Sequence, residues 1–174
     1  MSNNIQQAYE QIRKWYSIAG RLNHANHEAA LDGVAHQLEL IDEELKETFT
    51  AFEEQDVAEL VDGTCDMFFV VCGEMLRLEA MGVNIEKALA RVCENNMTKY
   101  PMTHEHEQNP SLAPEGSEIV FTDYGHVVYK RPLDGKILKP TNYVPVNLAG
   151  TFPVDFFGPV ESDDSTQVRD TQGE

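Results

Sequence analysis

Hydrophobic residues in the first hundred positions recur every three or four residues, with polar residues between them. This spacing is typical of amphipathic helices, whose apolar side chains gather on one face. The pattern predicts four helices, which cover residues 4–19, 28–54, 57–82 and 85–99. The second carries the clearest apolar stripe, formed by Leu38, Ile41, Leu45, Phe49 and Phe52. Together they predict an all-α fold built on a four-helix bundle.

Residues that start or stop helices stand at the ends of these segments. Asp56 and Asn84 are suited to cap the third and fourth helices, because their side chains accept backbone N–H groups. Gly20 and Gly82 follow the first and third helices, where glycine readily ends a helix. Pro101 prevents the fourth helix from continuing.

The character of the chain changes after Pro101. Residues 117–122 and 126–130, separated by a short turn, predict a small β-hairpin. An Asp-Gly turn at Asp134 then leads into an extended basic strip. The expected organisation is a helical catalytic bundle over 1–100, a hairpin and basic substrate-covering tail of the same domain over 101–150, and an acidic, disordered tail over 151–174.

Composition limits the function classes. The chain has 174 residues, 41% of them hydrophobic, and no apolar run long enough to span a membrane. Its formal net charge of −17 argues against binding of a nucleic-acid backbone. The three cysteines form no Cys-x-x-Cys pair, which favours a reduced, cytoplasmic protein. The negative charge either keeps the protein soluble or serves a specific site.

Two acidic clusters lie within the second and third predicted helices. The first comprises Glu43, Glu44 and Glu47, and the second comprises Glu59, Asp62 and Asp66. At about 100° per residue, Glu44 and Glu47 project about 60° apart, and the three carboxylates of the second cluster share an arc of about 60°. A short turn between the helices allows them to pack antiparallel with these acidic faces opposed.

Opposed carboxylates suit a hard divalent cation such as Mg²⁺, which prefers oxygen ligands. Such an ion can neutralise a triphosphate and lower the pKa of an attacking water, and a free carboxylate can accept the proton. A solvated acidic surface is the alternative. Lys46 is, however, the only basic residue between Glu39 and Asp66, whereas solvated helices usually intersperse oppositely charged partners.

Four motifs together resemble those of a known family. They are Glu44-x-x-Glu47, Glu59-x-x-Asp62 after eleven intervening residues, Asn96-Met-Thr-Lys99, and the run from Asp134 to Tyr143, DGKILKPTNY. In this order they are similar to the motifs of the MazG-like, all-α nucleoside triphosphate pyrophosphohydrolases of bacterial and phage type, which include the phosphoribosyl-ATP pyrophosphohydrolases. The resemblance covers residues 30–148 and implies a four-helix MazG-like bundle with a small β-hairpin and an extended C-terminal tail.

The resemblance also implies roles for individual residues. The metal ligands would be Glu44, Glu47, Glu59, Asp62 and Asp66, holding Mg²⁺ or, in its place, Mn²⁺. Glu43 would act with Glu44 and Glu47 in catalysis, as the base or an auxiliary ligand. The substrate would be held by Asn96, Lys99, Lys136, Lys139 and Tyr143. The implied reaction cleaves a triphosphate between its α and β phosphates and releases pyrophosphate.

Partners follow from the same resemblance and from the helix pattern. The expected substrate is a (deoxy)nucleoside triphosphate, with dGTP or dUTP as examples, and phosphoribosyl-ATP as the alternative within the family. A short bundle of this kind leaves an apolar face exposed, which predicts a homodimer or homotetramer. The alternative from another class is a non-catalytic acidic protein that mimics nucleic acid or binds a basic partner.

Histidines offer a second metal chemistry. The stretch from His104 to Glu107, HEHE, contains zinc-ligand side chains, but a solvated loop at a helix end is the simpler interpretation. His24 and His27 are either ligands, nucleotide contacts or surface residues.

Overall fold

The computed structural model describes residues 2–158, so most of the predicted acidic tail lies outside the described residues. The chain divides into two compact units. Among the described residues, one unit contains residues 2–83 and 152–158, and the other contains Asn84–Thr151. The two units are described separately below.

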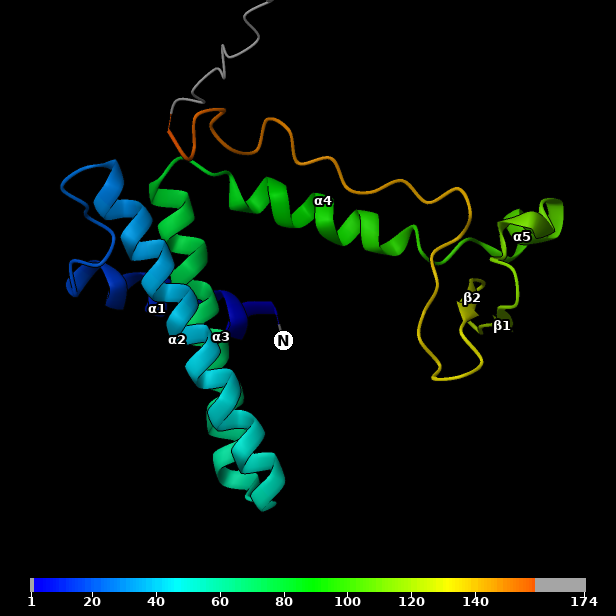
Figure 1. The fold of residues 1–174 in the computed structure, drawn as a ribbon, viewed down its shortest axis with the longest axis horizontal. Coiled ribbons are helices and arrows are strands. Elements are labelled where there is room, and N and C mark those ends of the chain that lie inside the picture. Colours follow the sequence, from blue (N-terminus) through cyan, green and yellow to red (C-terminus); the bar gives the residue numbers. More distant parts are fainter. Residues whose placement is uncertain (1, 159–174) are drawn as a thin grey trace, which may run out of the picture. The chain divides into compact units, whose positions relative to one another are not determined.

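Three helices form the first unit: α1 (Ser2–Ile18), α2 (His27–Glu54) and α3 (Val57–Ala80). Figure 1 shows α2 and α3 side by side along their length. No helix within residues 2–158 combines the length and apolar character needed to cross a membrane.

A two-residue connection reverses the chain between α2 and α3. Gln55 adopts a left-handed φ of 59° and ends α2, with its N–H directed at the last carbonyls of that helix. Asp56 caps α3 as predicted, because its Oδ1 accepts the N–H groups of Ala58 and Glu59 at 3.0 and 3.1 Å. This tight reversal places the two helices antiparallel.

Small residues allow α2 and α3 to approach closely. A Cβ built on Gly63 would lie 2.7 Å from Thr48 Oγ1 and 3.4 Å from Thr48 Cα, so only glycine fits without displacing α2. Gly33 makes a second close approach, to the Arg77 guanidinium and the His24 ring. Because both contacts tolerate no extra atoms, they define which residues of the two helices lie opposite one another.

An apolar core joins α1 to α3. It contains Ile12 and Tyr16 of α1 with Cys72 and Leu76 of α3, all at most 5% exposed. The Tyr16 hydroxyl lies where a Cβ of residue 73 would stand, which explains the glycine at that position. Burying these side chains contributes about 1.5–3 kcal/mol for each large one.

A buried polar network lies beside this core. Gln37 is completely buried and donates from Nε2 to the carbonyl of Val70 at 3.0 Å, while its Oε1 accepts from Arg77 Nε at 3.1 Å. Arg77 also donates to the carbonyl of Arg21 at 3.0 Å. Burial lowers the pKa of Arg77 and raises the pKa of the neighbouring Glu74. The polar side chains therefore connect α2, α3 and the loop before α2.

The predicted apolar stripe of α2 does not face α3. Phe49 and Phe52 are 61% and 66% exposed, and Val57 and Val61 at the start of α3 are 71% and 58% exposed. The face of α2 that contacts α3 instead carries small and polar residues such as Gly33, Gln37 and Thr48. The hairpin of α2 and α3 thus has an exposed apolar face at its connecting end.

The second unit begins with α4 (Ile85–Met97), capped by Asn84 as predicted. The short helix α5 (Thr103–Gln108) and a 3₁₀ turn, η1 (Pro110–Leu112), follow, then the strands β1 (Glu118–Phe121) and β2 (Val127–Lys130). The strands pair antiparallel, with Glu118 opposite Lys130 and Phe121 opposite Val127. The predicted hairpin is therefore present, and α5 and η1 were not predicted.

The second unit has a core of its own. Leu112, Val127 and Tyr129 are buried together, with Leu138 packed against them. His106 of α5 is also buried, and its Nδ1 lies 3.0 Å from the Tyr129 hydroxyl. This short polar contact joins α5 to β2 within the core.

The segment after β2 is held by the rest of the second unit. Leu138 N–H donates to the carbonyl of Tyr129 at 2.8 Å, so the chain folds back on β2 after the turn at Gly135. Further on, Arg91 of α4 donates to the carbonyls of Asn147 and Ala149. The segment therefore runs along α4 (Figure 1).

The predicted all-α character with a small hairpin is confirmed. By its contacts, α4 groups with residues 101–151, and the division between the compact units falls between Val83 and Asn84. The fourth helix is two residues longer in the prediction than α4 is in the structure, because the chain leaves the helix in a turn at Thr98 before Pro101 stops it.

Candidate functional site

The acidic clusters flank a close contact between α2 and α3. Thr48 meets Gly63 at this contact. Glu44 and Glu47 precede Thr48 by four and one residues, while Asp62 precedes Gly63 by one and Asp66 follows it by three. Because the helices are antiparallel, Glu44 lies within one residue of the level of Asp66, whereas Glu47 and Asp62 lie on opposite sides of the contact, each one residue from it. The tight helix spacing thus brings the two clusters together.

The pKa of Glu44 shows that their charges interact. Burial raises this pKa, and the negative charges of Asp66, Glu47, Glu43 and Asp62 raise it further. Glu44 is half-buried, whereas its four acidic neighbours are exposed. The structure therefore joins Glu44, Glu47, Asp62, Asp66 and Glu43 in one electrostatic neighbourhood. Glu59, one turn nearer the connection, is not among the charges that affect Glu44.

Among the described residues of the first unit, no basic side chain forms an ion pair with the carboxylates of this cluster. Lys46, the nearest basic residue in sequence, pairs instead with Asp42 at 2.5 Å on the exposed side of α2. Like charges held together without a counter-charge cost free energy, and a bound cation would remove that cost. Within residues 2–158, no three His, Cys, Asp or Glu side chains are close enough together to hold a metal ion. The donor chemistry suits Mg²⁺, and ligation would need side-chain rotation.

The predicted substrate residues all belong to the second unit, where the structure brings them together in two pairs. Lys99 Nζ donates to Asn96 Oδ1 at 2.6 Å at the end of α4. Lys139 Nζ lies 4.6 Å from the centre of the Tyr143 ring. Lys136 is exposed, and the structure does not join its side chain to either pair.

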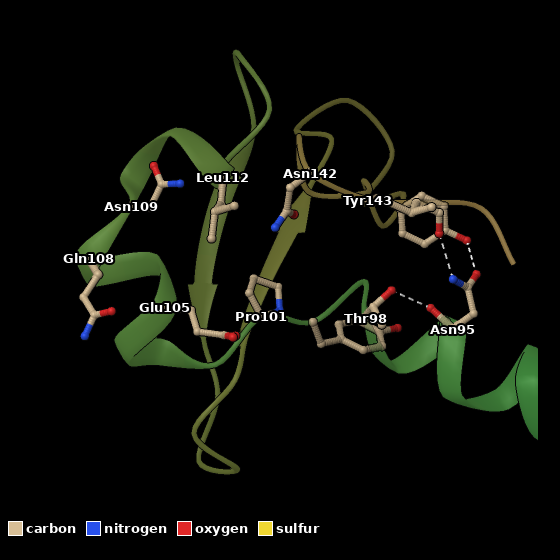
Figure 2. A pocket seen from close by; sticks show the side chains of 11 residues that line it. Asn95, Thr98, Pro101, Glu105, Gln108, Asn109, Leu112, Asn142 and Tyr143 are labelled. Carbon is tan, nitrogen blue, oxygen red and sulfur yellow. Dashed lines mark hydrogen bonds between the residues drawn. The ribbon is translucent and has the colours of Figure 1, made fainter.

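Tyr143 also lines a cavity of about 590 Å³ in the second unit. Its hydroxyl donates to Asn95 Oδ1 at 2.5 Å, and Asn95 Nδ2 donates to the carbonyl of Val144 at 2.8 Å. Figure 2 shows these bonds beside Thr98, with the Asn142 side chain projecting between Tyr143 and Leu112. The cavity lies between the end of α4, α5 and residues 142–144.

The histidine stretch differs from its prediction. His106 is buried and bonded to Tyr129, so the interpretation of HEHE as a solvated loop is wrong for this residue. Glu105 accepts the N–H of Met102 at 2.7 Å and starts α5. His24 is half-buried, and its Nε2 makes no hydrogen bond among the described residues, whereas His27 is exposed.

Several polar residues of both units were not predicted. Asn95 immediately precedes the predicted Asn96 and is the one that contacts Tyr143. The sequence feature that could have identified Asn95 is its position on the last turn of α4, four residues before Lys99. Gln37 and Arg77 carried a weaker signal, because a polar residue within a helical pattern is usually exposed.

Residues 17–96 match the model of the phosphoribosyl-ATP pyrophosphohydrolase family. This range contains both acidic clusters and ends at Asn96. No curated protein and no solved structure matches the chain.

Proposed function

Because residues 17–96 of this chain belong to the MazG-like and phosphoribosyl-ATP pyrophosphohydrolase superfamily, we propose that the protein is a magnesium-dependent nucleoside triphosphate pyrophosphohydrolase. The family has pyrophosphohydrolase activity. The proposed substrate is a (deoxy)nucleoside triphosphate, for example dGTP or dUTP, cleaved between its α and β phosphates. The observation that carries the proposal is the carboxylate cluster of α2 and α3, in which burial and the charges of the neighbouring carboxylates raise the pKa of Glu44.

The metal would be held by carboxylates from both helices: Glu44, Glu47, Glu59, Asp62 and Asp66. Bound there, Mg²⁺ or Mn²⁺ would supply positive charge to the phosphates and acidify a water molecule. The cluster contains oxygen donors only, which fits a hard cation. Repulsion among its carboxylates favours a state with a bound cation over a solvated state without one.

The residues of the chain then have distinct tasks. Glu43 is an exposed member of the cluster and would accept the proton of the attacking water. The water oxygen forms a bond to phosphorus as the bridging phosphorus–oxygen bond breaks, and pyrophosphate leaves with the other product, a nucleoside monophosphate. The pairs Asn96–Lys99 and Lys139–Tyr143, each of which contains one lysine, would contact the nucleotide. Lys136 would be a further cation.

A pyrophosphate-release assay tests this function. The assay measures release from each dNTP and NTP with Mg²⁺, for the parent protein, for Glu47→Gln and for Glu53→Gln. Glu53 is an exposed glutamate of the same helix outside the cluster, so its variant is the matched control. The expected result is activity that Glu47→Gln abolishes and Glu53→Gln retains. If no triphosphate is cleaved, the proposal is wrong.

Phosphoribosyl-ATP is the second candidate substrate, because the matching family model is that of the phosphoribosyl-ATP pyrophosphohydrolases. The same assay with phosphoribosyl-ATP decides between them. Cleavage of that compound alone would replace the proposed substrate and keep the reaction. Absence of all cleavage, with binding of a basic protein that survives chelation of metals, would favour a non-catalytic acidic protein.

We further propose that the protein self-associates as a homodimer or homotetramer. The support is the exposed apolar face at the connecting end of α2 and α3, since an exposed face of this kind is commonly an interface. A two-fold arrangement of hairpins would cover it with the same face of a second copy. Light scattering after size-exclusion chromatography should show a dimer or tetramer that Phe49→Asp dissociates and Thr50→Asp does not. A monomeric parent protein would refute this proposal.

A further inference from the structure

The cavity of the second unit has an unusual lining. Of its eleven residues, four carry a carboxamide side chain, and one, Glu105, carries a charge. The carboxamides belong to Asn95, Gln108, Asn109 and Asn142. Its volume of about 590 Å³ falls within the range of about 300–1,000 Å³ typical of ligand sites. A lining of this kind suits a neutral, planar ligand that both donates and accepts hydrogen bonds.

One side of the cavity is held in place, and another is free to bind. Asn95 uses its carboxamide to fix Tyr143 and the backbone of Val144. By contrast, Asn142 and Gln108 of the lining are exposed, and their carboxamides form no hydrogen bond with another side chain or backbone group of residues 2–158. Figure 2 shows the Asn142 side chain projecting into the space between Tyr143 and Leu112. A carboxamide can pair with a nucleobase through one donor and one acceptor.

We propose that this cavity binds the nucleobase of a nucleotide and that it prefers guanine. The Tyr143 ring offers a surface on which a base can stack. Glu105 provides the preference, because a carboxylate only accepts hydrogen bonds and guanine presents two adjacent N–H donors on one edge. Its Oε2 already accepts the Met102 N–H, and the remaining lone pairs of the carboxylate are available.

The positive charges agree with a nucleotide. Lys99 adjoins the lining residues Thr98 and Tyr100, and Lys139 lies over the Tyr143 ring. Both lysines are thus beside the cavity and not among its lining residues. A base within the cavity would leave phosphates near these cations. The choice of a nucleotide rests on the proposed function, whereas the choice of a neutral heterocycle rests on the lining alone.

Calorimetric titration of the full chain with nucleosides tests the proposal. Guanosine, adenosine and uridine carry no phosphates, so no metal and no hydrolysis is involved. The expected result is that guanosine binds most tightly and that Asn142→Ala weakens its binding about tenfold or more. Asn147→Ala is the matched control, because Asn147 lies in the same segment outside this cavity.

A second variant tests the preference for guanine. Glu105→Gln keeps a side-chain acceptor for the Met102 N–H, so α5 keeps its start. It should reduce guanosine binding and leave adenosine binding unchanged. Three results would overturn the proposal: no nucleoside binding, equal weakening by the Asn147 and Asn142 variants, or tighter binding of adenosine. Since pyrophosphate release is measured separately, failure here leaves the proposed function intact.

Discussion

The contact between Gly63 and Thr48 gives a prediction about the spacing of the acidic helices. Replacing Gly63 by alanine adds a Cβ that would lie 2.7 Å from Thr48 Oγ1. Such crowding costs about 1–3 kcal/mol. Alanine also improves helix propensity over glycine by about 1 kcal/mol. The net expectation for Gly63→Ala is a loss of up to about 2 kcal/mol in the free energy of unfolding.

Removing the hydroxyl of Thr48 should relieve this cost. The atoms left near the new Cβ are Thr48 Cα at 3.4 Å and Thr48 Cβ at 3.5 Å, which are ordinary contact distances. In a Thr48→Ala background, Gly63→Ala should therefore stabilise the protein by about 1 kcal/mol, the propensity gain alone. The coupling between the two substitutions should amount to about 1–3 kcal/mol.

Urea unfolding followed by tryptophan fluorescence measures this coupling. Trp15 is the only tryptophan of the chain and contacts the rings of Tyr16 and Phe69 in the first unit. Thr50→Ala is the control. Thr48 and Thr50 both donate from the hydroxyl to the backbone carbonyl four residues earlier, at 2.7 and 3.1 Å, but Thr50 lies on the exposed side of α2. It should not rescue Gly63→Ala. Additive effects of the Thr48 and Gly63 substitutions would show that the helices do not meet at this contact.

Three further predictions concern charge and buried polar groups. Because the pKa of Glu44 is raised in the folded protein, its ionised form destabilises that state at pH values above this pKa. Glu44→Gln should therefore raise the melting temperature of the metal-free protein at neutral pH, and the gain should shrink as the pH falls through the raised pKa; a gain that is constant with pH would contradict this cause. Arg77→Met should lower the free energy of unfolding by about 1–3 kcal/mol in a urea titration, because it leaves the buried Oε1 of Gln37 without its partner. Tyr129→Phe should cost about 0.5–1.5 kcal/mol in the same measurement by removing the bond to His106, and no loss would show that this bond contributes nothing.

The helices of the first unit were predictable because their signals are local. Asp56 and Gly82 act on the backbone next to them, and both behave in the structure as predicted. The apolar stripe of α2 was equally visible. Its periodicity gives the direction of the face along the helix and does not tell whether α3 or another copy of the chain covers it. For that reason, the exposure of Phe49 and Phe52 could not be predicted from the sequence.

The candidate site was predictable to the level of residue types and helix faces. The opposition of the two clusters follows from antiparallel helices, and the interaction of Glu44 with Asp66 agrees with it. Their register depends on the fit of Thr48 against Gly63, which no periodicity contains. The cavity of the second unit was beyond prediction, because it joins Asn95 to Tyr143 across 48 residues of sequence.

The separate cores of the two units have a consequence for how this protein can evolve. Substitutions around Ile12 and Leu76 alter the packing of the first unit, which carries the acidic clusters. Substitutions around Leu112 and Val127 alter the packing of the second unit, which contains the cavity. Neither set belongs to the other core. Selection can therefore modify the second unit by insertion or repacking and keep the helices that carry the carboxylates. A lineage of such proteins would diversify in the ligands it accepts faster than in the reaction it performs.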